Sequence, residues 1–184
     1  MRTNTFKELM ELKFTSPFEA MPGIIARLLN ESYAKLVKAE PEIWQHEEAH
    51  WKEADRSVFE NPNTIGACTF MSWYGKNIVG FFSFDPRPSP AYGIIGHNCI
   101  LPDYRNQGFG KQQMGEALRK LRQRMIRQAQ VSTSDHPFFL PAQRMYVACG
   151  FIEVKRVPWD RDLRRNMIHY EQELDNQLME QRLK

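Results

Sequence analysis

The chain has 184 residues, of which 42% are apolar and 26% charged, a composition typical of a globular protein and not of a disordered one. Its 25 Lys and Arg residues and 22 Asp and Glu residues are intermixed and leave a formal net charge of +3. This balance gives no reason to expect a nucleic-acid-binding surface or attraction to an anionic membrane. The length suits one domain, and we expect a single domain over residues 1–184.

Targeting signals and cysteines bear on where the protein works. Residues 1–22 carry charges in their first turns and no long apolar run, which is unlike a signal peptide. No segment approaches the roughly 20 apolar residues that span a bilayer. Cys68, Cys99 and Cys149 are odd in number, widely separated and set among apolar residues, so we expect reduced core thiols in a cytoplasmic protein.

The first half of the chain changes from a helical to a strand period. Apolar residues at helical spacing predict a helix over residues 22–38 and a second over 41–61, which Asn61-Pro62 ends. Residues 65–74 and 78–85 are rich in β-formers and joined by a turn sequence containing Gly75, which predicts a hairpin.

The second half alternates strands and helices. We expect a strand over 92–101, a long helix over 109–130, a short strand over 130–133 and a short helix over 141–149. Two strands, over 152–157 and 166–174, complete the order. This order predicts an α+β (mixed α/β) fold and not a doubly wound Rossmann fold.

The segment from Asn98 to Lys111 carries the most specific chemical signal. A strand ends at Pro102, a turn follows, and a helix begins near Gly108 and Phe109. Glycines at the start of a helix let backbone N–H groups approach a pyrophosphate, and the helix N-terminus adds partial positive charge. Arg105 and Lys111 could supply charge to phosphate oxygens. Alone, Arg-x-x-Gly-x-Gly is weak, because glycines before helices are more often caps, and it matches neither the dinucleotide fingerprint nor a P-loop.

A second segment strengthens the first. In residues 142–151, Ala142 lies four positions before Tyr146, which is followed by Gly150-Phe151 at the next strand. The two segments, in this order and spacing, resemble the two signatures of the GNAT family of N-acetyltransferases. The close match covers residues 94–151, about a third of the chain.

The resemblance implies a GNAT-like acyl-CoA N-acyltransferase fold, with a central mixed, mostly antiparallel sheet flanked by helices. It implies acetyl-CoA as co-substrate, no metal, and direct attack by a primary amine in a ternary complex. The backbone at Ile100 would hydrogen-bond the thioester carbonyl, and the pantetheine arm would run along the strand that ends at Leu101. The pyrophosphate would lie on amides of the following residues: Arg105, Asn106, Gln107, Gly108, Phe109, Gly110 and Lys111.

The same resemblance assigns acid and base roles. Tyr146 aligns with the tyrosine that protonates the departing thiolate. Family members often place a Glu or His base at even spacing before the residue equivalent to Ile100, but those positions here are Ile94, Gly96 and Asn98. His97 is out of phase and can serve only if a β-bulge re-aims it; otherwise Asn98 could hold a relaying water. The chain also departs from the family at Phe139, where many members have a CoA-contacting asparagine.

The acceptor is open: a small-molecule or peptide amine, with specificity from the N-terminal helices and the loops 85–90 and 158–165. The acidic helix over 41–61 would favour a cationic amine, although a solvated face explains its charge as well. We expect no nucleic-acid or membrane partner. Since many relatives dimerise, a homodimer stays open.

Two alternatives compete with this interpretation. His46-Glu47-Glu48-Ala49-His50 matches the His-Glu-x-x-His signature of zinc peptidases, but no third ligand follows at a zincin spacing, and burial of His50 beside Trp51 would explain it. The arginine-rich stretch 119–127 could make the chain a non-catalytic, nucleic-acid-binding module, although no aromatic residues interleave its charges.

Overall fold

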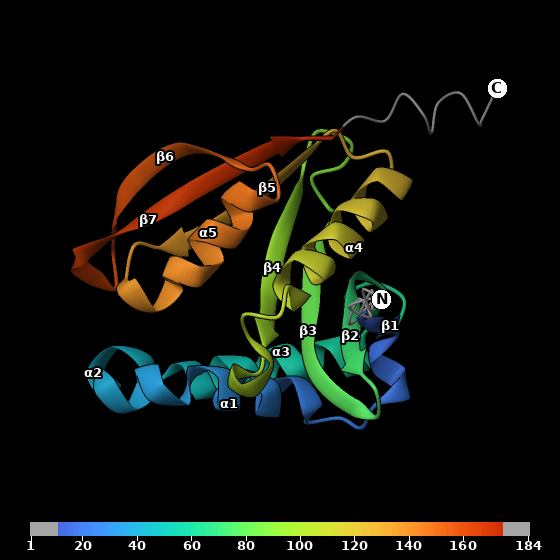
Figure 1. Ribbon diagram of the computed structural model, residues 1–184, viewed down its shortest axis with the longest axis horizontal. Coiled ribbons are helices and arrows are strands. Elements are labelled where there is room, and N and C mark those ends of the chain that lie inside the picture. Colours follow the sequence, from blue (N-terminus) through green and yellow to red (C-terminus); the bar gives the residue numbers. More distant parts are fainter. Residues whose placement is uncertain (1–10, 175–184) are drawn as a thin grey trace, which may run out of the picture.

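A computed structural model describes residues 11–174 of the chain (Figure 1). Its centre is a seven-stranded sheet in the order β1-β2-β3-β4-β5-β7-β6. The strands are β1 (Lys13–Thr15), β2 (Thr69–Tyr74), β3 (Asn77–Asp85), β4 (Gly93–Ile100), β5 (Gln128–Ser134), β6 (Ile152–Trp159) and β7 (Asp162–Glu173). All neighbouring strands are antiparallel except β4 and β5, which confirms the expected mixed, mostly antiparallel sheet.

Helices cover both faces of this sheet. On one face lie α1 (Ile24–Ala39), α2 (Pro41–Trp44) and α3 (Glu47–Glu60); on the other lie α4 (Phe109–Gln123) and α5 (Leu140–Ala148) (Figure 1). Successive residues of β3 point to opposite faces of the sheet and belong to two separate hydrophobic cores. Phe81 is in the core with Leu28 of α1, and Phe82 is in the core with Leu121 of α4. Each such buried side chain contributes roughly 1.5–3 kcal/mol by leaving water.

Two buried polar side chains fix the helices to the rest of the molecule. The carboxylate of Asp55 on α3 accepts hydrogen bonds from the amides of Gly23 (2.7 Å) and Ile25 (2.8 Å) and so caps the start of α1. Gln113 of α4 is 2% exposed, and its amide donates to Ser72 Oγ on β2 and to the Cys99 carbonyl on β4. Buried side-chain hydrogen bonds therefore hold α1 to α3 and α4 to the sheet.

The sequence predictions differ from the structure at several boundaries. The helix expected over 41–61 is broken at Gln45 and His46 into α2 and α3. The helix expected over 109–130 ends at Gln123, because Met125 adopts a positive φ of 56° and residues 128–134 pair along β7 instead. Residues 66–68 form a 3₁₀ turn before β2, and the short edge strand β1 was not predicted.

The hairpin prediction is confirmed, with Tyr74 opposite Asn77 and Gly75 at φ 59° in the turn. Cys68, Cys99 and Cys149 are free thiols, the first two buried and the third half-buried. In residues 11–174 no helix is long and apolar enough to cross a membrane.

Candidate active site

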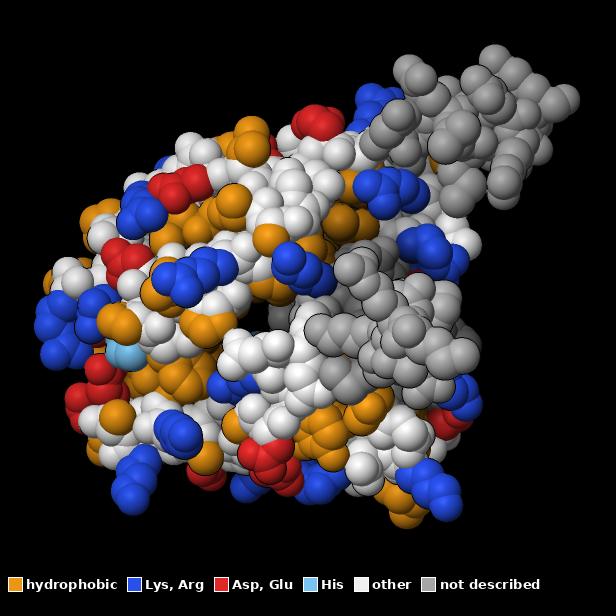
Figure 2. Space-filling view, in the orientation of Figure 1, with side chains coloured by type: hydrophobic (Ala, Val, Ile, Leu, Met, Phe, Trp, Pro, Cys, Tyr) orange, Lys and Arg blue, Asp and Glu red, His pale blue; other side chains and the backbone are white. Residues whose placement is uncertain are grey.

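The sheet opens between its two parallel strands. β4 and β5 pair only at Gly93 with Ala129 and at Ile94 with Gln130, and beyond these residues they diverge. The opening forms a cleft of about 650 Å³, which is lined in part by residues 95–98 of β4 and 131–134 of β5. Figure 2 shows the surface hollowed between α5 and the loop that leads into α4. The opening gives a ligand access to strand backbone that elsewhere in the sheet is paired.

A β-bulge in β4 decides which side chains face this cleft. Phe82 pairs with Asn98 and Phe84 pairs with Ile95, so β4 has one residue more than β3 between these pairs. Ile95 and Asn98 therefore face the same side of the sheet, toward α4 and α5, although they lie three apart in sequence. His97 faces the opposite side, the one covered by α1 and α3.

Tyr146 of α5 meets Asn98 across the opening. Its side chain is 4% exposed and packs against Phe151 and Tyr170, with ring centroids 6.0 and 5.7 Å away. Burial raises the pKa of Tyr146 to about 12, and a hydrogen bond with the Asn98 side chain opposes the rise. The phenol is thus a protonated group at the wall of the cleft and can donate a proton there.

His97 lines the same cleft from the other side of β4. Its edge is open to the cleft, but the surrounding protein disfavours the charged imidazolium and lowers the pKa of His97 below its usual value, against the opposing effect of Glu47. The imidazole is therefore neutral near pH 7, the form that accepts a proton. The bulge lies before Asn98 and does not turn His97 onto the face of Asn98 and Ile100, although His97 and Tyr146 both line the same cleft.

The end of β4 presents a free amide to the opening. The Leu101 amide donates to the Val79 carbonyl on β3 at 2.8 Å. Because strand amides alternate in direction, the Ile100 amide points away from β3, toward the side where β4 has no partner strand. This is the amide that the family resemblance assigns to the thioester carbonyl.

The loop after β4 has a conformation suited to an anion. Asn106 and Gly108 both adopt positive φ, 62° and 83°, and Gly108 is the N-cap of α4. Within the described part of the chain, the amides of residues 106–110 have no hydrogen-bond acceptor. Five adjacent free donors at the positive end of a 15-residue helix could bind phosphate oxygens.

The side chains of the loop have different surroundings. The Arg105 guanidinium donates to the carbonyls of Ile100 and Ser32, both at 3.0 Å, so it binds backbone of β4 and α1. Phe109 is 1% exposed and packs against Tyr74, with only its backbone left for a ligand. Gln107 bonds the Asp103 carbonyl, whereas Lys111 is exposed. None of the residues 100–111 lines the 650 Å³ cleft. These residues follow the cleft-lining residues 95–98 in the chain and lie at and beyond the end of β4.

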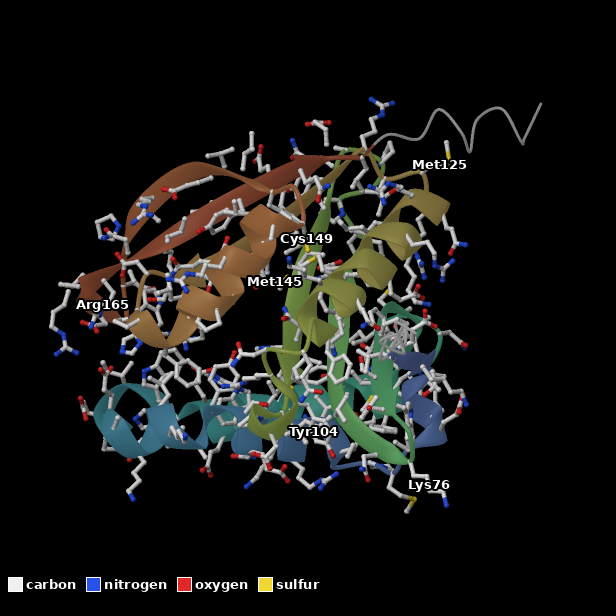
Figure 3. All side chains as sticks on the ribbon, viewed as in Figure 1. Lys76, Tyr104, Met125, Met145, Cys149 and Arg165 are labelled. Atoms are coloured by element: carbon white, nitrogen blue, oxygen red, sulfur yellow. The ribbon has the colours of Figure 1, made fainter. Side chains whose placement is uncertain are left out.

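Helix α5 lies next to the start of α4, beside the loop that follows β4. Figure 3 shows Met145 and Cys149 on the side of α5 that faces α4. A Cβ on Gly110 would lie 3.7 Å from Met145 Cγ. The two helices therefore flank the space above the end of β4.

The sequence interpretation missed the aromatic side chains of the cleft. Tyr33, Trp44, Phe139 and Trp159 all line it, and Phe139 occupies the position where many relatives have an asparagine. These residues come from four separate elements, so no local motif links them. A solvated face was one of two explanations for the acidic helix, but Glu47 on it is buried, lines the cleft and pairs with Arg161.

The two alternative motifs find less support. Across residues 11–174 no group of three or more His, Cys, Asp or Glu side chains could hold a metal ion. Glu47 of the zincin-like motif is engaged by Arg161 and lies 3.4 Å from His50. The side chain of His50 is 60% exposed, so the expected burial beside Trp51 was wrong. On α4, Arg119 pairs with Glu116, and Arg124, directly after the helix, lies over the Phe84 ring.

Comparisons with known proteins agree with this architecture. A profile of the family described as acetyltransferase (GNAT) matches residues 25–151. No curated protein sequence matches significantly. A structure assigned to the GNAT acetyltransferases, from Desulfovibrio desulfuricans, is similar over 90% of this chain and 99% of its own, with a TM-score of 0.70 and 15% identity.

Two further structures have the same fold. One is assigned as a phosphinothricin N-acetyltransferase, with a TM-score of 0.65 and 17% identity over 90% of this chain and 99% of its own. The other is yncA from Salmonella typhimurium, assigned as an acetyltransferase and solved with its cofactor acetyl-CoA. It covers 89% of this chain and 94% of its own, with a TM-score of 0.60 and 14% identity.

Proposed function

Because the chain belongs to the GNAT family of acetyltransferases, we propose that it transfers an acetyl group from acetyl-CoA to a primary amine by direct attack in a ternary complex. The observation that carries this proposal is the run of free amides over residues 106–110, directly after the strand whose Ile100 amide faces the opening. These donors fit the diphosphate and the thioester carbonyl of one extended ligand. That yncA was solved with acetyl-CoA supports the same ligand.

Binding falls to the backbone of residues 105–111. The amides of Asn106, Gln107, Gly108, Phe109 and Gly110 would donate to diphosphate oxygens, and Lys111 would add an exposed positive charge. Arg105 would contribute its backbone while its side chain holds Ile100 in place. Ile100 and Leu101 would lie along the pantetheine arm.

The chemistry falls to three groups around the cleft. His97 would take a proton from the incoming ammonium, which frees the nitrogen lone pair. As the C–N bond forms and the C–S bond breaks, the Ile100 amide would stabilise the negative charge on the carbonyl oxygen. Tyr146 would then give its proton to the departing thiolate. Its raised pKa keeps the phenol protonated at neutral pH, so a proton is available when the thiolate leaves.

A calorimetric titration with acetyl-CoA, followed by a screen of amines for release of CoA thiol, tests the proposal. We expect one acetyl-CoA per chain and thiol release that depends on the amine. Absence of acetyl-CoA binding would refute the proposal. The cytoplasmic location, the one-domain organisation and the open question of a homodimer remain predictions from sequence.

A further inference from the structure

Four aromatic side chains form a continuous surface at one side of the cleft. We call this surface the aromatic wall; it comprises Tyr33, Trp44, Phe139 and Trp159. The rings are in mutual contact, with centroids 6.4 Å apart for Tyr33–Trp44, 5.6 Å for Trp44–Phe139 and 5.4 Å for Trp44–Trp159. Their contacts with one another fix their orientations before any ligand arrives.

The aromatic wall is only partly covered by the protein. Trp44, at its centre, is 7% exposed, but Tyr33, Phe139 and Trp159 are half-buried and border the cleft. A flat apolar group in the cleft would cover this surface and gain the offset or edge-on ring contacts that aromatic side chains prefer. An aliphatic chain would gain less, because it covers less of the rings.

The charges beside the aromatic wall are mainly negative. Glu47, Asp160 and Arg161 line the cleft. Arg161 pairs with Glu47, whereas Asp160 makes no hydrogen bond or ion pair within residues 11–174. One carboxylate is thus left without compensation next to Trp159. An ammonium group is attracted to such a site and a carboxylate or phosphate is repelled.

We propose that the acceptor is a primary amine carried on an aromatic ring, an arylalkylamine, whose ring lies on the aromatic wall while Asp160 attracts its ammonium group. This inference rests on the proposed function and adds the class of acceptor. Amino acids are disfavoured by their carboxylate, and linear polyamines by their lack of a ring. The aromatic ring distinguishes this class from cationic amines in general.

Steady-state kinetics at saturating acetyl-CoA test the inference. The acceptors are 2-phenylethylamine and tryptamine, with hexylamine as the aliphatic control and spermidine as the polyamine control. We expect kcat/KM for the two arylalkylamines to exceed that for hexylamine and spermidine by tenfold or more. Equal or lower values for the arylalkylamines would overturn the inference.

Variants of the wall add a second test. Trp159→Ala should raise KM for tryptamine about tenfold or more with little change in kcat, and Trp159→Phe should recover most of the loss. Leu163→Ala is the matched control, because Leu163 is 81% exposed on the same hairpin and does not line the cleft. Phe139→Leu, on a different element, repeats the test should Trp159→Ala fold poorly. Unchanged tryptamine selectivity in both Trp159→Ala and Phe139→Leu would overturn the inference.

The titration with acetyl-CoA separates the two levels of the claim. If acetyl-CoA binds but arylalkylamines are not preferred, the acceptor class is wrong and the proposed function stands. If acetyl-CoA does not bind, the proposed function fails and the acceptor class fails with it.

Discussion

The Nε atom of Arg105 donates a 3.0 Å hydrogen bond to the carbonyl oxygen of Ile100, five residues earlier. The same guanidinium reaches Ser32 on α1 and lies 5.9 Å from the Phe138 ring centroid. The arginine of the Arg-x-x-Gly-x-Gly segment therefore fastens the loop to the end of β4 and to α1. We infer that it positions the Ile100 amide.

Replacing Arg105 by Ala should remove this fastening. We expect the free energy of unfolding to fall by about 1–3 kcal/mol and acetyl-CoA binding to weaken, without a change in its salt dependence. Arg105→Lys should not restore either property, since an ammonium lacks the planar fork that serves two carbonyls. Lys111→Ala is the comparison, with an expected shallower salt dependence. Denaturant titration measures the stability, and calorimetry at several salt concentrations measures the salt dependence of acetyl-CoA affinity. A weaker salt dependence for Arg105→Ala at unchanged stability would contradict the positioning role of Arg105.

Gly108→Glu tests the anion site. A carboxylate among the free amides should repel a diphosphate and lower acetyl-CoA affinity by roughly 100-fold or more. Gly108→Gln carries the same strain at φ 83°, so the difference between the two variants isolates the charge. Gly115→Glu, at an exposed position of α4 with open space around it, is expected to bind like the native chain. Native-like affinity in Gly108→Glu would place the diphosphate elsewhere.

Tyr146→Phe removes the proton donor and keeps the ring. We expect kcat to fall by about 100-fold while the Kd for acetyl-CoA stays unchanged, because the phenol acts on the leaving group. Single-turnover kinetics with calorimetry separate the two effects. A variant with native kcat would show that the thiolate takes its proton from another source.

The pH dependence of kcat should report His97. Its pKa is lowered, so it is deprotonated at a lower pH than the ordinary value of about 6.5. As pH rises, kcat should therefore increase with its midpoint below pH 6.5, with no fall until the range of Tyr146, near pH 12. His97→Gln should lose this acidic limb and 10- to 100-fold or so in kcat. If the limb persists in the variant, the base is another group.

Gly80→Ala tests the packing that holds β3 against β4. A Cβ on Gly80 would lie 2.1 Å from the Cys99 carbonyl oxygen and 2.9 Å from Gln113 Nε2, and the backbone atom cannot move aside cheaply. We expect a loss of about 3 kcal/mol in the free energy of unfolding. Gly115→Ala, exposed and unobstructed in α4, should instead gain roughly 0.5–1 kcal/mol. Urea titrations of both variants measure the contrast, and equal stability of the two would refute the clash.

The sequence by itself determined the family, the order of most elements and the loop before α4. These features depend on local chemistry: Gly75 in a two-residue turn, Gly108 at a helix N-cap and apolar residues at helical spacing in α4.

Only the tertiary structure decided what surrounds the cleft. The bulge is a register shift between β3 and β4, and the aromatic wall joins residues from both halves of the chain, Tyr33 and Trp44 with Phe139 and Trp159. The Arg105 side chain binds backbone carbonyls, one of which belongs to Ser32 on the distant helix α1. Glu47 is buried because the turn after β6 brings Arg161 to it. Such contacts join residues distant in sequence, and local periodicity carries no information about which of them meet.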